Sequence, residues 1–298
     1  MSPDPAISGR LAAERDSATV RFWGVRGSIP VPGPHTAGHG GNTSCVEVRA
    51  EGQIIILDAG TGIRALGNSL MQESGSRPLS LTMLVTHTHS DHIQGFPFFA
   101  PAYEASTRIR ILGFSEDGSG LQKAFARLME PAYFPVGLSQ MRGDIAFEDL
   151  NGDAFQIGGI RVSTCRTSHP GFCGAYRMDT GAASICYIPD HEADGRRAPE
   201  CEAVAQLIHE ADLVILDSQY TAGEYRGREG WGHSSMEDAV RTACDARAKC
   251  LHLFHHDPSH DDKFLEQMLQ EARRIAAGSG TRIEAAREGA QVTLAGGA

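Results

Sequence analysis

One seven-residue segment, Thr-His-Thr-His-Ser-Asp-His at residues 86–92, constrains this chain more than any other part of the sequence. It directly follows the apolar run at residues 81–85, which predicts a buried strand, so the segment forms the turn that leaves a strand end. Zinc accepts imidazole nitrogens and carboxylate oxygens as ligands. Two ligands spaced i, i+2 can face one ion while the next two face a neighbouring ion. The turn therefore predicts a metal site with these candidate ligands: His87, His89, Asp91 and His92.

Side chains of the same kind end three later strand-like runs, at residues 160–169, 184–190 and 250–255. These side chains are His169, Asp190 and His255. The pattern His-x-His-x-Asp-His, followed in order by a histidine, an aspartate and a histidine, resembles the signature of the metallo-β-lactamase-fold hydrolases. The resemblance covers nearly the whole chain. It implies an α/β (α+β) protein folded as a four-layer αββα sandwich.

The same resemblance implies how the ligands are shared between two divalent metal ions. One ion is expected to bind His87, His89 and His169, the other Asp91, His92 and His255, with Asp190 bridging both. Zinc is the first expectation, and manganese and iron accept the same ligands. Asp58 resembles the carboxylate that holds a metal-binding histidine in this family.

The order of predicted elements agrees with two similar halves, each made of strands followed by helices. Alternation and apolar runs predict strands at residues 20–23, 45–49, 53–57, 81–85, 108–112 and 213–216, besides the three runs that end in ligands. Helices are predicted at residues 63–72, 121–129, 199–210, 235–246 and 263–277. The spacing of Ser234 and Glu237 is that of a capping box at the start of one helix.

Composition agrees with an enzyme that does not enter a membrane. Residues 1–18 are polar and lack the apolar centre of a signal peptide, so they predict a flexible tail before a single domain at residues 19–298. No run approaches the roughly 18 apolar residues of a membrane helix. The seven cysteines are scattered and include no C-x-x-C pair, which favours free thiols in a reducing cytoplasm.

Another aspartate and another histidine indicate which branch of the family the chain resembles. Asp217 ends the strand at residues 213–216, and His233 stands at the start of a later helix. This pairing is similar to ribonuclease Z and related phosphodiesterases. By that resemblance, Asp217 orients His233, and His233 protonates the leaving oxygen. The alternative is that His233 only caps or packs.

The last histidine ligand is chosen between two neighbours. His255 precedes a proline by three residues, as the family ligand does, and Leu251 and Leu253 are expected to point inward with it. His256, His260 and His191 are expected to lie outside the metal site.

Two glycine-rich segments, at residues 21–30 and 40–45, allow two interpretations. Their backbone N–H groups could line the substrate mouth and bind a phosphate. Alternatively, the glycines only form tight turns.

The expected reaction is attack on phosphorus by a hydroxide shared between the two ions. Asp91 steers its proton, and His233 protonates the leaving group. A net charge of −10 and the lack of a basic run disfavour a large nucleic acid, so a small phosphodiester such as a 3′,5′-cyclic nucleotide is the first expectation. The alternatives are a ribonuclease Z-like tRNA 3′ endonuclease and a glyoxalase II-like thioester hydrolase. His89 argues against a di-iron redox protein, and the resemblance implies a homodimer.

Overall fold

The computed structural model describes residues 17–114, 120–193 and 198–296. The predicted tail at residues 1–18 lies outside this part of the chain except for its last two residues. Ser17 and Ala18 belong to strand β1 (Ser17–Gly24), and Ala18 is fully buried. Both residues pair with β14 (Gln291–Ala295), so the predicted boundary of the tail is two residues too late. The pairing also joins the first described strand to the last.

Two seven-stranded sheets form the centre of the molecule. The first sheet has the strand order β14, β1, β2 (Cys45–Ala50), β3 (Gln53–Leu57), β4 (Leu79–Val85), β5 (Thr107–Gly113) and β6 (Asp144–Asp149). The second has the order β13 (Arg282–Ala285), β12 (Cys250–Phe254), β11 (Leu213–Asp217), β10 (Ser184–Ile188), β9 (Gly174–Asp179), β8 (Ile160–Arg166) and β7 (Ala154–Ile157). Both sheets are mixed: β3 to β6 run parallel in the first, and β10 to β13 in the second.

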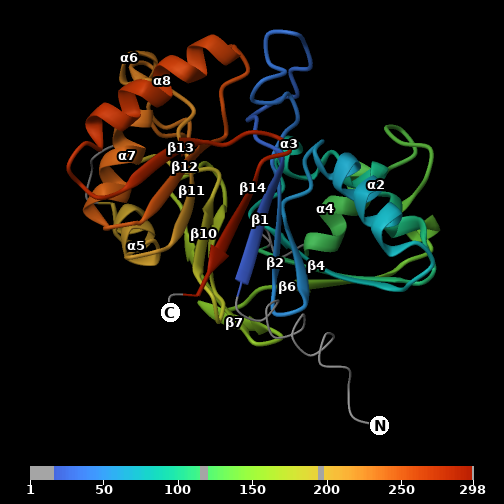
Figure 1. The fold of residues 1–298 in the computed structure, drawn as a ribbon. Coiled ribbons are helices and arrows are strands. Elements are labelled where there is room, and N and C mark those ends of the chain that lie inside the picture. The colour runs from blue at the N-terminus through green and yellow to red at the C-terminus, as the bar shows by residue number, and fades with distance from the viewer. Residues whose placement is uncertain (1–16, 115–119, 194–197, 297–298) are drawn as a thin grey trace.

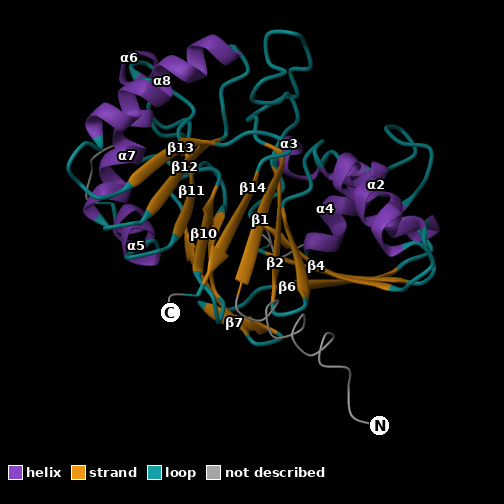
Figure 2. Cartoon of the chain, in the orientation of Figure 1, coloured by secondary structure: helices purple, strands orange, loops and turns teal. Residues whose placement is uncertain are grey.

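Helices cover the outer face of each sheet (Figures 1 and 2). The first sheet carries α2 (Ile63–Ser74) and α4 (Leu121–Leu128), and the second carries α5 (Pro199–Leu207), α7 (Met236–Asp245) and α8 (Asp262–Ile275). The remaining helical segments are short: α3 (Ser90–Ile93), η1 (Phe96–Phe98), η2 (Ala100–Tyr103), η3 (Leu138–Gln140) and α6 (Ala222–Tyr225). The layers confirm the predicted αββα sandwich.

The core has three apolar layers, and strand β11 shows how they are separated. Leu213 and Ile215 face the other sheet, whereas Val214 and Leu216 lie beneath the helices. Every residue of β11 is buried, as expected for a parallel strand covered on both faces. Burial of each such side chain contributes about 1.5–3 kcal/mol.

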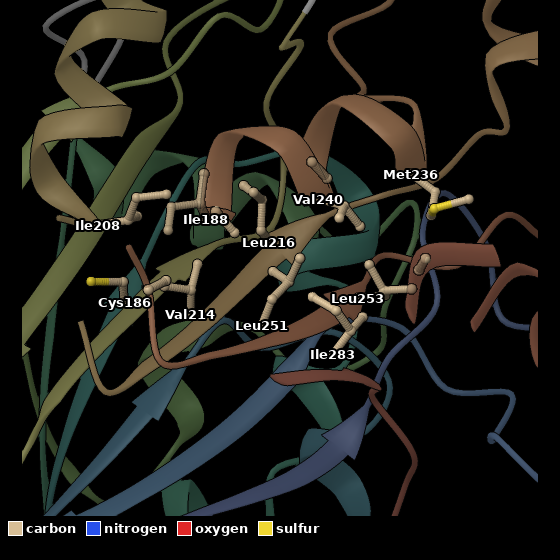
Figure 3. Close-up of a cluster of buried hydrophobic side chains, with 14 of the residues drawn as sticks. Cys186, Ile188, Ile208, Val214, Leu216, Met236, Val240, Leu251, Leu253 and Ile283 are labelled. Atoms are coloured by element: carbon tan, nitrogen blue, oxygen red, sulfur yellow. The ribbon is translucent and has the colours of Figure 1, made fainter. Parts of the chain in front are cut away.

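Leu251 and Leu253 point inward, as predicted, and pack with Val240 beneath the helices (Figure 3). The predicted capping box is wrong. Helix α7 is capped by Ser235, whose Oγ accepts a hydrogen bond from the backbone N–H of Asp238 at 3.1 Å. The Ser234 hydroxyl instead bonds to backbone groups outside this helix.

Within the described residues, no helix combines the length and the apolar character needed to cross a membrane. All seven cysteines lie in this part of the chain, and each is a free thiol.

Candidate active site

The seven predicted ligands converge where strands of both sheets end. The first sheet contributes the turn after β4 and the short helix α3, which carry four of them. The second sheet contributes the other three, which lie one to three residues after β8, β10 and β12. Because parallel strands place their carboxyl ends at one edge of a sheet, residues far apart in sequence meet here. The structure brings together all of them: His87, His89, Asp91, His92, His169, Asp190 and His255.

The ligand atoms form two groups. Within each group, the potential ligand atoms lie no more than 4.8 Å from one another. One group contains His87, His89, His169 and Asp190, and the other contains Asp91, His92 and His255.

Asp190 faces both groups. Its Oδ2 lies 3.7 Å from the Nε2 atoms of both His87 and His169. Its Oδ1 lies 3.1 Å from His92 Nε2 and 3.4 Å from His255 Nε2. One carboxylate oxygen for each group is the arrangement that the resemblance implies for a bridging ligand.

Several of these atoms are buried without a hydrogen-bond partner, namely His87 Nε2, His92 Nε2 and Asp190 Oδ1. A buried polar atom left unpaired costs about 1–3 kcal/mol, so three that point at one another need a compensating group. Burial lowers the pKa of His87 well below its usual range. Despite its own burial, the surrounding histidines hold the pKa of Asp190 well below its usual range. Burial would lower the pKa of His92, but the facing carboxylates raise this pKa well above its usual range, so a metal ion bound there would displace a proton. Neutral imidazole and ionised carboxylate are the forms that bind metal, and the clusters are consistent with a dinuclear metal site.

Asp58 holds one of the candidate ligands from behind, as predicted. His92 Nδ1 lies 2.8 Å from Asp58 Oδ2, which leaves His92 Nε2 directed at the cluster. The carboxylate also accepts hydrogen bonds from the backbone N–H of Thr86 at 2.8 Å and from the Tyr187 hydroxyl at 2.9 Å. Partners of this kind fix the tautomer of a metal-binding histidine.

His255 is held from two sides by residues whose part in the site was not predicted. Its Nδ1 lies 3.0 Å from Gln219 Oε1, and its backbone has a φ of 59°. Gly27 packs directly against the ring, because a Cβ atom at this glycine would lie 2.3 Å from His255 Nδ1. The available signal for Gln219 is its position two residues after Asp217, at the end of the same strand.

The glycine-rich segments support the ligands from within the protein. The Ser28 N–H donates to Asp91 Oδ2 at 2.7 Å, and the Gly27 N–H donates to the His256 carbonyl at 3.1 Å. The Gly40 N–H donates to the Thr36 carbonyl at 2.7 Å. Of the two predicted alternatives, these contacts favour tight turns over a cradle for a substrate phosphate.

His233 and Asp217 lie together beside the ligands. His233 Nδ1 is 2.8 Å from Asp217 Oδ2, and Asp217 is fully buried. The His233 ring stacks on that of His255, with ring centroids 4.9 Å apart. A ring nitrogen of His233 also lies within 4.8 Å of ligand atoms of Asp190 and His255. Because Ser235 caps the helix, capping does not explain His233.

Charge around His233 favours its protonated form. Burial disfavours the imidazolium, but the Asp217 carboxylate outweighs this effect and raises the pKa of His233 to about 9. Asp217 is itself fixed by the backbone N–H groups of His191, at 3.1 Å, and Gln219, at 3.0 Å.

The other three histidines considered from the sequence make hydrogen bonds to groups outside the predicted ligand set. His191 Nδ1 accepts a hydrogen bond from the Ser168 N–H at 3.2 Å, and His256 Nε2 donates to the Ala286 carbonyl at 3.0 Å. His260 Nε2 lies 2.9 Å from Glu224 Oε1.

Comparison with known proteins agrees with this fold. A sequence model described as the Beta-lactamase superfamily domain matches residues 53–256, more than half of the chain. With its metallo-β-lactamase fold and clustered histidines and aspartates, the chain belongs to the metallo-β-lactamase superfamily.

Its relatives include ribonuclease Z. Ribonuclease Z of Aeropyrum pernix is 25% identical over 266 residues, covering 75% of this chain and 84% of the relative. The solved structure of the metallo-β-lactamase fold protein YhfI from Bacillus subtilis has a TM-score of 0.67 at 20% identity, covering 93% of this chain and 99% of that one. The short form of human tRNase Z has a TM-score of 0.62 at 19% identity, covering 93% and 99%.

Proposed function

We propose that this metal-dependent hydrolase is a phosphodiesterase in which His233 is the general acid. The observation that carries the proposal is the His233–Asp217 pair, with its 2.8 Å contact, packed against the candidate metal ligands. A thioester hydrolase does not need this pair, since a thiolate leaves readily without a positioned acid. The pair therefore favours an alkoxide leaving group.

The proposed ligands for two divalent ions, zinc first, are those predicted from the sequence. Asp190 would bridge, because one of its oxygens faces each ligand group. When bound, two such ions lower the pKa of a water molecule toward about 7 and neutralise charge on a phosphoryl group. Asp91, held by the Ser28 N–H, is also placed to accept a proton or hydrogen bond from the attacking water.

Proton transfer to the leaving group is assigned to His233 Nε2. Nδ1 is occupied by Asp217, so the other ring nitrogen is free to face the substrate. With a pKa raised to about 9, the ring carries both protons at neutral pH. The buried carboxylate orients the ring and stabilises its positive charge.

The comparisons favour the ribonuclease Z-like alternative over the small phosphodiester expected first. The curated relatives named ribonuclease Z align over 75–86% of the chain. RNA cleaved at the 3′ side of a tRNA precursor is therefore the first candidate substrate. These relatives weaken the expectation that disfavoured a large nucleic acid.

A small phosphodiester is the second candidate, favoured by the net charge of −10. A polyanion must find several Lys or Arg side chains, whereas two metal ions alone can neutralise one phosphodiester. The test is parallel incubation of the metal-loaded enzyme with a 3′-extended tRNA, 3′,5′-cyclic nucleotides, bis(p-nitrophenyl) phosphate and a thioester. Hydrolysis of the thioester alone would overturn the phosphodiesterase proposal. Trimming of the tRNA without opening of a cyclic nucleotide would select ribonuclease Z activity.

A further inference from the structure

The loop before His233 presents an aromatic ring to solvent. Trp231 is 59% exposed, which is unusual for the largest apolar side chain. It lies between Gly230 and Gly232, whose φ angles of 83° and 88° are in the left-handed region that favours glycine. The indole is therefore carried on a backbone shape that the flanking residues specify.

A buried carboxylate holds this loop in place. Glu192, only 6% exposed, accepts hydrogen bonds from the Gly230 N–H at 2.7 Å and the Gly232 N–H at 2.9 Å. The Tyr225 hydroxyl donates to the same carboxylate. Burial of a carboxylate is costly unless its oxygens are paired, and here the pairing fixes both residues beside Trp231.

The loop is also tied to the ligand cluster. The Gly232 carbonyl accepts a hydrogen bond from His169 Nδ1 at 3.0 Å. A Cβ atom at Gly232 would lie 2.2 Å from the same nitrogen, so no other residue fits at this position without a shift. Gly232 therefore bonds both to Glu192 and to His169, a proposed metal ligand, and it directly follows Trp231.

We propose that Trp231 is a platform on which a nucleobase next to the scissile phosphodiester stacks. The inference rests on the proposed phosphodiesterase function and names the part of the substrate that the site recognises. The indole lies two residues before the proposed general acid, on a backbone that Glu192 fixes at both neighbouring glycines, and it offers a flat apolar face to a ligand. Every base has a face that can stack on it, so the subsite favours nucleotides over other phosphodiesters without selecting a sequence.

Positive charge accompanies the platform. The backbone N–H of Trp231 donates to the Arg228 carbonyl at 3.1 Å, and the Arg228 guanidinium lies 4.6 Å from the centre of the Tyr220 ring. Tyr220 in turn has its ring centroid 6.1 Å from that of His233. A cation on the same loop suits a ligand that combines a base with a phosphate.

The test compares two p-nitrophenyl phosphodiesters that differ only in the base-bearing group. These are thymidine 5′-(p-nitrophenyl phosphate) and methyl p-nitrophenyl phosphate, assayed with metal-loaded enzyme. Trp231→Ala is expected to raise KM for the thymidine ester about 5- to 150-fold, the range of one base stack, with kcat nearly unchanged. On the methyl ester it should stay within about twofold of wild type. Trp231→Phe should recover most of the loss, because a ring remains.

Tyr133→Ala is the matched control, since it removes an aromatic side chain that is 79% exposed on another segment. This control variant should leave KM and kcat unchanged for both esters. An equal change on both esters in Trp231→Ala would overturn the inference while the phosphodiesterase function stands.

Fluorescence gives a reading that needs no turnover. Adenosine 5′-monophosphate is expected to quench the emission of the wild type, whose other tryptophan, Trp23, is buried. Quenching should disappear in Trp231→Phe. A lack of quenching in the wild type would overturn the inference, as would a Trp231→Ala variant that changes oligomeric mass in size-exclusion chromatography but not the KM for nucleotides. If neither ester is hydrolysed yet quenching is seen, the stacking site stands and the proposed function fails.

Discussion

The proposed role of each site residue depends on the direction in which its individual polar atoms point. Asp190 directs one oxygen to each ligand group, and His233 has one ring nitrogen fixed by Asp217 and one free. In the second case, a buried carboxylate fixes the direction of an imidazole ring. The chemistry proposed here follows from those directions.

Replacement of Asp190 by alanine should lower the metal content from two ions per chain to one or none. A bridging carboxylate serves both ions, so its loss weakens both. Elemental analysis of purified protein measures this directly. Asp144→Ala, which removes an exposed carboxylate paired with Arg108, should retain two ions. Full occupancy in Asp190→Ala would show that Asp190 does not bridge.

His233→Ala should keep its metals and lose roughly 10²–10⁴ in turnover on substrates with poor leaving groups. It should lose much less on p-nitrophenyl esters, whose leaving group needs little protonation. Asp217→Asn should give a smaller loss of the same kind, because the ring is still oriented but its charge is less stabilised. Equal losses on both substrate types would remove His233 from the role of acid.

The pH dependence of activity is a second test of His233 as the general acid. A general acid works only while protonated, and the pKa of His233 is raised to about 9. Activity on poor leaving groups should therefore persist through neutral pH and fall as pH rises through that pKa. Bound cations oppose the effect of Asp217, so the decline should begin no higher than about pH 9. The His233→Ala variant should lack this limb of the profile.

Elements of structure were predictable where the signal was local. A buried strand followed by a turn of histidines and aspartate is enough to locate four candidate ligands, and β3 is predicted at its observed bounds. Gln219, Gly27 and Glu192 were missed because each acts through a partner that only tertiary contacts bring close. His255 lies in the candidate ligand cluster, and its binding of metal stays a prediction.

Gly27 leaves the space that the His255 ring occupies. Gly27→Ala should push the His255 ring aside, since the new Cβ would lie 2.3 Å from Nδ1. We expect the loss of about one metal ion per chain, with the fold retained. Gly33→Ala is the matched control in the same loop, where the nearest atom to a Cβ would be 3.9 Å away. Elemental analysis and circular dichroism of both variants test this expectation, and equal metal contents would contradict it.

The whole molecule is joined across its centre by the ligand set. Four candidate ligands follow β4 of the first sheet and three follow strands of the second. Bound ions would therefore link the two sheets in addition to the apolar layer between them. The homodimer implied by the family resemblance remains a prediction that sedimentation can test.

Removal of metal by a chelator should consequently destabilise the entire domain. A ligand present at 100 times its Kd contributes about 2.7 kcal/mol to the folded state. In a large domain each kcal/mol shifts Tm by about 2–4 °C, so chelation should lower Tm by about 5–10 °C. Scanning calorimetry with and without EDTA measures the shift, and added zinc should reverse it. Asp190→Ala should respond much less, because it has less metal to lose. An unchanged Tm in the wild type after verified removal of metal would mean that the apolar layer alone holds the two sheets together.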